Sequence, residues 1–217
     1  WGTLKFNGSG SSSALGAVDD VMPNAYEESW DILDTDGTST SGSPMVIGGG
    51  GGANMFIYTS PTVAGATLTI AYQNDGGAAA VEDSYTDFAI AYSPEMVEGL
   101  TLGYARADQN AGVSIDVQKS TAYVKYATGG FTIGYQMSEA DHDTKTSSQD
   151  STSYGITYAV NDDFSIGYHA HTLEPDSGAS SSASNDQEST GVSASYTMGG
   201  MTIAGAMNET DNMRGVA

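Results

Sequence analysis

The sequence predicts an all-β protein whose antiparallel strands follow one another in up-and-down order. Glycine is abundant, at 28 of 217 residues, and serine is frequent too, which disfavours a helical bundle. A short motif also recurs five times: an apolar residue, Thr or Ser, an aliphatic residue, Gly or Ala, and usually Tyr. Its centres lie 31 to 37 residues apart, which leaves room for two strands, one tight turn and one longer connection. The repeated unit is therefore a β-hairpin. The centres are Ile70, Leu102, Ile133, Ile166 and Ile203.

Taken in order, the elements form one domain over residues 1–217. A strand over 1–6 is followed by a long connection over 7–53, and five hairpins then fill 54–208. Their strands are 54–60 with 66–73, 85–93 with 100–107, 120–128 with 131–138, 153–160 with 163–172, and 189–198 with 201–208. Gly129-Gly130, Gly199-Gly200 and Asn161-Asp162 are expected to supply the positive φ angles of tight hairpin turns. Acidic loops over 74–84, 108–119, 139–152, 173–188 and from 209 onward should face outward.

Charge and composition exclude several classes of function. The chain has 6 Lys and Arg against 27 Asp and Glu, a net charge of −21, so it lacks the basic patch that a nucleic-acid partner requires. Without cysteine it has neither a disulfide framework nor a thiolate metal site. The glycine run 48–52 lacks the Lys-Ser/Thr of a phosphate-binding loop, and no nucleophile with its base is evident. We therefore do not expect an enzyme.

Each predicted strand has one apolar and one polar face. In 131–137 the odd positions are Phe, Ile, Tyr and Met, and the even positions are Thr, Gly and Gln. Aromatic residues gather near the short turns on the apolar face, as in the interfacial girdle of a membrane barrel. Short and long connections alternate, which favours a transmembrane β-barrel with a wet interior. A secreted acidic surface or adhesion protein with Ca²⁺-binding loops remains the alternative, because a soluble sandwich also alternates.

The N-terminal quarter resembles the general porins of Gram-negative bacteria, and most of all those of alphaproteobacteria. The matching segments are WGTLKF (1–6), LGAVDDVMPNAYEESWD (15–31) and Tyr58-Thr59-Ser60-Pro61. The resemblance implies an outer-membrane barrel of roughly sixteen strands, usually a homotrimer, that passes small hydrophilic solutes by diffusion. It also implies that 7–53 folds inward as a constriction loop. The predicted strands number eleven, and an odd number cannot close a bacterial barrel with both termini on the same side, so we expect an internal portion of a longer porin.

The candidate functional residues follow from the loop and from strand parity. Segment 7–53 has several carboxylates and no Lys or Arg, which predicts a cation-selective constriction. The constriction candidates are Asp19, Asp20, Glu27, Glu28 and Asp31. The pore-wall candidates are Lys5, Lys125, Gln136, His169 and His171. Residues 24–33 are expected to form one or two helical turns. Lipid and lipopolysaccharide are the expected partners, with acidic outer loops attracting divalent cations.

Three further features have competing interpretations. Asp34 and Asp36 precede a glycine as at the start of a calcium loop, but no bidentate Glu follows, so a plain turn competes with a structural Ca²⁺ site. His169 and His171 share a face and could ligate a transition metal, although pore-lining histidines without metal are the preferred interpretation. Arg106 has the parity of the lipid face, which leaves three options: a position at the outer rim, a bulge or a trimer contact.

Overall fold

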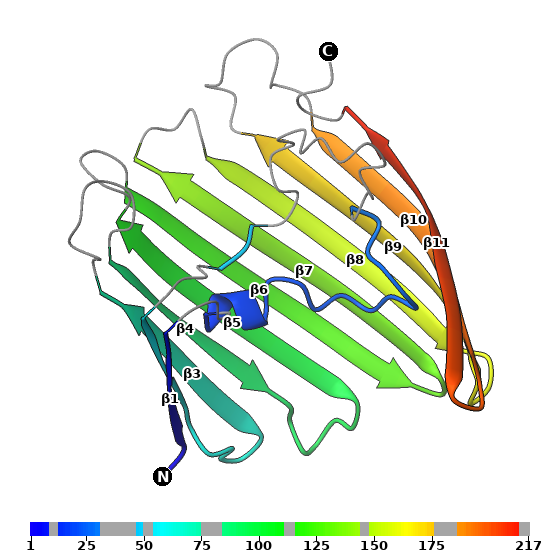
Figure 1. The fold of residues 1–217 in the computed structure, drawn as a ribbon, viewed down its shortest axis with the longest axis horizontal. Coiled ribbons are helices and arrows are strands. Elements are labelled where there is room, and N and C mark those ends of the chain that lie inside the picture. The colour runs from blue at the N-terminus through cyan, green and yellow to red at the C-terminus, as the bar shows by residue number, and fades with distance from the viewer. Residues whose placement is uncertain are drawn as a thin grey trace.

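The computed structural model describes residues 1–8, 13–30, 47–49, 54–74, 84–110, 116–143, 148–175 and 186–212. In these ranges the chain forms one antiparallel sheet whose eleven strands follow sequence order, β1 to β11 (Figure 1). This confirms the predicted fold class. One 3-10 turn, η1 (Leu15–Ala17), precedes β2. The strands are β1 (Thr3–Asn7), β2 (Met55–Thr59), β3 (Ala66–Gln73), β4 (Tyr85–Tyr92), β5 (Leu100–Asn110), β6 (Asp116–Thr128), β7 (Phe131–His142), β8 (Gln149–Ala159), β9 (Phe164–Pro175), β10 (Gln187–Met198) and β11 (Met201–Asp211).

The sheet is curved, and its concave face is crossed by residues 13–30, which we call the inner loop (Figure 1). Strands β1 and β11 are its two edges among the described residues. Within those residues, no helix is both long enough and apolar enough to span a bilayer.

Strand β7 shows how the two faces differ. Ile133 and Met137 are 51% and 54% exposed on the convex face, whereas Gln136 and Ser138 are 3% and 8% exposed on the concave face. A soluble sandwich buries its apolar face and leaves its polar face in water. Here the apolar face is outermost, as contact with lipid requires, and this disfavours the secreted alternative. Aromatic pairs line the convex face near the short turns, and Phe131 and Tyr158 stack with ring centroids 4.3 Å apart.

The hairpin turns use two kinds of turn chemistry. Gly129 and Gly130 have φ angles of 56° and 85°, the left-handed pair that a two-residue turn needs. The expectation of positive φ at Asn161-Asp162 is wrong, because the described non-glycine residues with positive φ lie elsewhere. Instead, the Asn161 Oδ1 accepts hydrogen bonds from the backbone N–H groups of Asp163 and Phe164, both at 2.9 Å. An Asx-type turn therefore reverses this hairpin.

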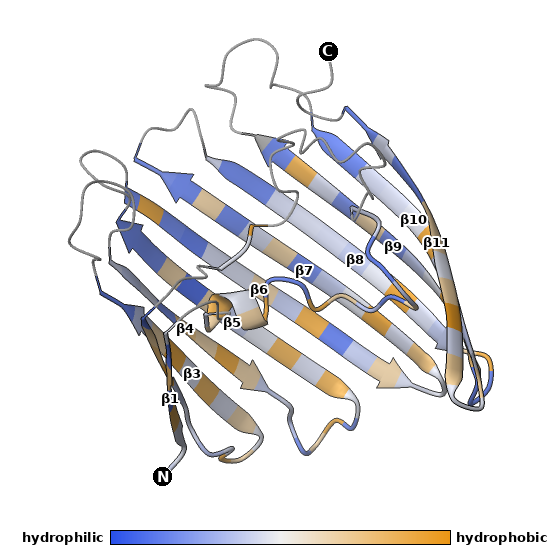
Figure 2. Ribbon diagram, viewed as in Figure 1, coloured by the Kyte–Doolittle hydropathy of each residue, from blue (hydrophilic) through white to orange (hydrophobic). Residues whose placement is uncertain are grey.

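The strands run farther toward the long connections than the sequence predicts. For example, β5 continues to Asn110 and β7 to His142, with cross-strand pairing unbroken. Figure 2 shows hydrophilic residues at these strand ends. A strand does not end where its side chains become polar, because the backbone hydrogen bonds to the neighbouring strand can also form outside the apolar band. Several carboxylates predicted to lie in loops are therefore on strands. They are Asp108, Asp116, Glu139, Asp141, Asp150, Glu174, Glu188, Glu209 and Asp211.

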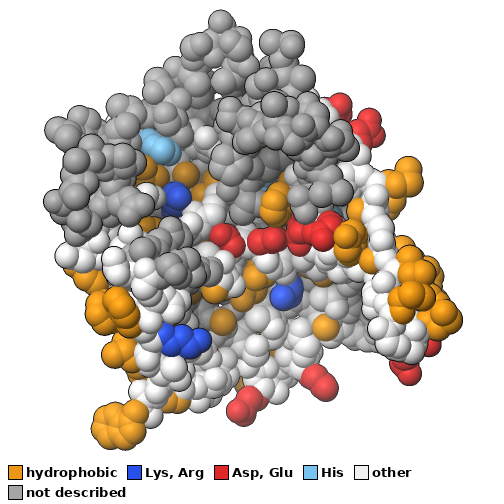
Figure 3. Space-filling view, viewed as in Figure 1, with side chains coloured by type: hydrophobic (Ala, Val, Ile, Leu, Met, Phe, Trp, Pro, Cys, Tyr) orange, Lys and Arg blue, Asp and Glu red, His pale blue; other side chains and the backbone are white. Residues whose placement is uncertain are grey.

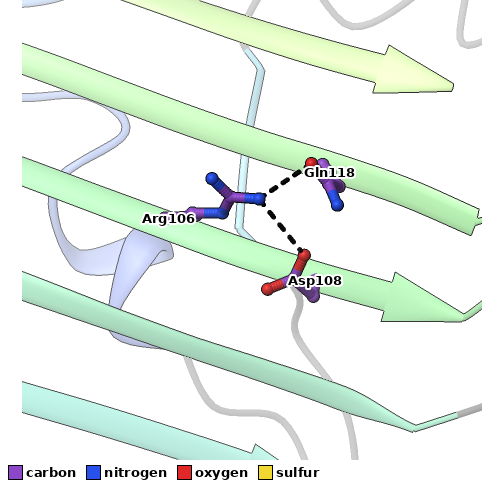
Figure 4. Close-up of polar contacts among 3 residues, drawn as sticks. All are labelled: Arg106, Asp108 and Gln118. Atoms are coloured by element: carbon purple, nitrogen blue, oxygen red, sulfur yellow. Dashed lines mark hydrogen bonds and ion pairs between the residues drawn. The ribbon is translucent and has the colours of Figure 1, made fainter.

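Arg106 lies on the convex face of β5. It pairs in register with Phe88 on one side and Ser120 on the other, so there is no bulge at this position. Its Nη2 donates to the Gln118 Oε1 at 2.8 Å and lies 3.8 Å from the Asp108 Oδ1 (Figure 4). These polar partners belong to the strand ends beyond the apolar band. This location agrees with the outer-rim interpretation.

Candidate functional site: the inner loop and the wall beneath it

The inner loop begins over β4, where a buried carboxylate holds it. The Leu15 N–H donates to the Asp87 Oδ2 at 2.7 Å, and the Tyr85 hydroxyl donates to the same oxygen at 2.9 Å. The Ser13 Oγ lies 3.0 Å from that hydroxyl. Apolar loop residues cover the wall around these bonds and exclude water from them. This cluster contains Ala14, Leu15, Val18 and Met22 of the loop with Met55, Ala71, Tyr85, Ala89, Ala105, Ala107 and Tyr123 of the wall.

The middle of the loop is held by the amide of Gln136 on β7. Its Nε2 donates to the carbonyl oxygens of Val18 and Asp19, at 3.1 and 2.8 Å. The same nitrogen is 3.0 Å from the Thr121 Oγ1 on β6. Because the side chain is 3% exposed, these bonds form away from bulk water, where leaving them unmade is costly.

A lysine on β6 holds the returning part of the chain, residues 47–49. The Lys119 Nζ donates to the Gly48 carbonyl at 3.0 Å, and the Gly49 N–H donates to the Asp19 Oδ2 at 3.0 Å. Burial raises the pKa of the Asp19 carboxyl above its ordinary value, although the bond from Gly49 and the attraction of Lys119 oppose the shift. Asp19 therefore binds a proton more readily than an exposed aspartate.

Glycines on the wall make room for the middle and end of the loop. A Cβ at Gly134 would lie 2.5 Å from the Pro23 Cδ, and one at Gly155 would lie 2.3 Å from the Pro23 oxygen. A Cβ at Gly167 would lie 2.9 Å from the Ala25 nitrogen. Strands β7, β8 and β9 thus have no side chain where the loop backbone rests on them. We call Gly134, Gly155, Gly167 and Gly191 the glycine lane, since Gly191 on β10 continues it beneath Ser29.

The far end of the loop is bonded to β9, β10 and β11. The Ser29 N–H donates to the His169 Nδ1 at 3.1 Å, and the Ser29 Oγ is 2.7 Å from the same nitrogen. The Ser189 Oγ donates to the Ser29 carbonyl oxygen. The Asn208 Nδ2 donates to the Glu28 carbonyl oxygen at 2.9 Å. The loop is thus attached at its beginning, middle and end.

The loop brings negative charge to the middle of the concave face. Its residues 13–30 include Asp19, Asp20, Glu27 and Glu28 but no Lys or Arg. Figure 3 shows acidic side chains in a row across the middle of this face, with one Lys or Arg side chain just below the row and others farther from it. Between low-dielectric walls, such charges produce a focused field.

The predicted wall residues share the face that carries the loop. Lys5 pairs in register with Ile57, and Lys125 has the parity of the buried Tyr123. His171 is buried, and its Nδ1 is 2.5 Å from the Ser153 Oγ. Asp31 and the calcium candidates Asp34 and Asp36 lie outside the described residues. Where the structure describes the chain, no cluster of three or more His, Asp or Glu could hold a metal.

One expectation about the loop needs correction. In the described part of this segment, 24–30, residues 25–27 are bends and 29–30 form a turn, but no helix is present, and the helical turn lies earlier, at Leu15–Ala17. Asn24 donates its side-chain N–H to the Glu28 carboxylate and so links positions four apart without a helix. Sequence reasoning also missed the anchors Asp87, Ser29 and Lys119. For Asp87 a signal existed, because a carboxylate on the buried face of a strand requires a partner.

Comparison with known proteins assigns the family. The sequence profile described as Gram-negative porin matches residues 1–215. No curated protein matches the sequence. The fold is similar to that of a porin refined at 1.8 Å resolution, with 15% identity, a TM-score of 0.67, and 97% of this chain and 72% of that chain covered.

Two further solved structures have the same fold. OmpT, an outer-membrane protein of Vibrio cholerae, has 13% identity and a TM-score of 0.66, with 97% of this chain and 66% of that chain covered. The anion-selective porin of Comamonas acidovorans has 13% identity and a TM-score of 0.69, with coverage of 96% and 64%. The chain thus spans about two thirds of these structures. With its apolar convex face and polar, loop-crossed concave face, the chain belongs to the Gram-negative porin family of the outer membrane.

Proposed function

We propose that this protein forms a water-filled channel through which small hydrophilic solutes and ions diffuse passively, and that the inner loop sets its narrowest part. One observation carries the proposal: a loop with four carboxylates lies across the polar concave face of a sheet whose convex face is apolar. Lipid contacts the convex face, so the concave face is left for water. Membership of a porin family favours a channel over an enzyme.

We further propose that the channel prefers cations. Four loop carboxylates, Asp19, Asp20, Glu27 and Glu28, lie on the concave face with few cations in the described wall. Lys119 is already bonded to Gly48. The similarity to an anion-selective porin concerns the fold, since identity is 13%, and selectivity depends on which charges line the lumen.

The expected partners follow from the outer surface and from one similar structure. A trimer form of the Vibrio cholerae OmpT is among the similar structures, and this supports a homotrimer here. The convex face presents exposed carboxylates at the strand ends that lead into the long connections. Their negative potential would attract divalent cations shared with anionic lipopolysaccharide, a general electrostatic effect. These carboxylates include Glu139, Asp141, Asp150, Glu174, Glu188, Glu209 and Asp211.

The test is the zero-current potential of reconstituted channels across a KCl gradient. The loop variant combines Asp19→Asn, Asp20→Asn, Glu27→Gln and Glu28→Gln. The control variant combines Asp150→Asn, Glu188→Gln, Glu209→Gln and Asp211→Asn, and so removes the same charge from the convex face. We expect a cation-selective parent, a large loss of preference in the loop variant and a small loss in the control. The Debye length is about 8 Å at physiological ionic strength, so the preference should weaken as salt rises.

Each part of the proposal can fail separately. Absence of conductance from the correctly folded protein would refute the channel. An anion-selective parent would refute the charge assignment. Equal effects of the two variants would show that the loop carboxylates do not line the narrow zone.

A further inference from the structure

His169 holds the far end of the inner loop through a hydrogen bond of fixed direction. The Ser29 backbone N–H, at 3.1 Å from the His169 Nδ1, can only donate. The Nδ1 must therefore offer its lone pair, which leaves the ring neutral with its hydrogen on Nε2. Both residues are fully enclosed, with His169 2% and Ser29 0% exposed.

His171, two residues along the same face, has a reversible partner instead. Its Nδ1 meets the Ser153 hydroxyl, which donates to a neutral ring and can accept from a protonated one. Protonation of His169 differs, because its Nδ1 has two partners. A hydrogen on Nδ1 could be donated to the Ser29 Oγ, at 2.7 Å, but it would displace the Ser29 backbone N–H. The Ser29 N–H would then lose its acceptor inside a buried site, which is costly.

The groups around His169 offer little compensation for a positive charge. The neighbouring strands present uncharged residues on this face: Ser153 and Gly155 of β8, Ser189 and Gly191 of β10, and Asn208 and Thr210 of β11. Among the described residues, the titratable neighbours are His171, two residues away on β9, and Glu27 and Glu28, which directly precede Ser29 in the loop. The Glu28 carboxylate already accepts a bond from Asn24.

We propose that His169 is the positioning residue that fastens the far end of the inner loop only while its imidazole is neutral, so that acid releases residues 26–30 from the wall. The bonds of Ser189 and Asn208 to the carbonyls of Ser29 and Glu28 would loosen with it, because they depend on the same placement. The beginning of the loop, held by Asp87 and Gln136, stays in place. Release changes the narrow zone, a consequence that rests on the proposed channel function.

A spin label tests the release without relying on conductance. The chain has no cysteine, so Tyr26→Cys, at a half-exposed loop position, gives a single labelling site. Spectra of the folded protein in detergent are compared at about pH 7.5 and about pH 3, well below the ordinary histidine pKa, because protonation of His169 must also break a buried hydrogen bond. We expect the immobile component to be lost reversibly in acid. His169→Gln keeps an acceptor that does not titrate, so it should keep the immobile component at both pH values, and His171→Gln should behave like the parent.

Three outcomes would overturn the proposal: an immobile label in the parent at both pH values, an acid response that persists in His169→Gln, or one that disappears in His171→Gln. The second would assign the response to the loop carboxylates. If His169→Gln does not fold, nitrogen NMR of the three histidines in the parent tests the proposal instead. A hydrogen on the His169 Nδ1 near neutral pH would exclude the hydrogen bond from the Ser29 N–H and so refute the proposal.

Channel recordings complete the test. In folded protein that conducts, we expect acid to increase current fluctuations in the parent and not in His169→Gln. Fluctuations that rise equally in both proteins would refute a role of His169 in positioning the loop. If the folded protein does not conduct, the proposed function fails, while the label and the NMR measurement still decide the role of His169.

Discussion

Adding one methyl group to the glycine lane tests whether the inner loop rests on the wall as described. In Gly155→Ala the new Cβ would lie 2.3 Å from the backbone oxygen of Pro23, whereas ordinary contact begins at 3.4 Å. The loop must therefore retreat by about 1 Å, because the clash is with backbone rather than with the end of a flexible side chain. Two residues on, the Ala25 N–H donates to the Ser193 Oγ at 3.1 Å, and a retreat of that size stretches this bond beyond bonding distance.

The expected cost is about 1–3 kcal/mol for overpacking, plus about 1 kcal/mol for the weakened hydrogen bond. Gly205→Ala is the matched control, because Gly205 lies on β11 with nothing within 4 Å of its added Cβ. It should be neutral, or stabilising by up to about 1 kcal/mol. Equilibrium unfolding in urea, with refolding into lipid vesicles, measures both variants against the parent. Equal stability and equal channel conductance of the two variants would refute the contact between Pro23 and β8.

Two further predictions concern the membrane face and the response to pH. Ile133→Arg places a charge on the convex face and should cost about 2–4 kcal/mol, whereas Thr132→Arg on the concave face should cost about 1 kcal/mol; equal costs in the folding assay would contradict the assignment of the faces. Burial raises the pKa of Asp19, so its protonated form favours the folded state at low pH, and this contribution is lost as pH rises through the raised value. As the pH is lowered, Asp19 should therefore lose its charge at a pH above about 3.9, the ordinary aspartate pKa, and cation selectivity should fall with it. Asp19→Asn should remove this part of the dependence of selectivity on pH.

Strand parity was predictable because lipid and lumen impose it on every strand. The odd and even positions of 131–137 identified the two faces of β7, and the glycine pair 129–130 identified its turn. The strand ends were less predictable. Composition changes from apolar to acidic near Asp108 and Glu139, but the backbone ladder continues across that boundary. Composition reports the surrounding medium, whereas strand length depends on hydrogen bonding between neighbours.

The attachment of the loop could not be predicted, because its contacts join residues far apart in the chain. Gln136 bonds to Asp19 across 117 positions, and Ser193 to Ala25 across 168. Such contacts leave no periodicity within the loop. The helical expectation, which is wrong over the described residues 24–30, came from local spacing, whereas tertiary contacts determine the conformation of those residues. The glycine lane was visible as small residues on the polar face, but only the folded loop shows what fills the space.

The contacts that hold the inner loop indicate that the charge of its side chains can change without a change in the course of its backbone. Wall side chains bind mainly to loop backbone: Asp87 to the Leu15 nitrogen, Gln136 to the Val18 and Asp19 oxygens, and His169 to the Ser29 nitrogen. Backbone groups are the same whatever side chain the residue carries. The wall therefore fixes where the loop runs, while the loop's own side chains determine the charge of the narrow zone. Removal of loop charge should then alter selectivity with little change in stability, whereas removal of a wall anchor should alter both.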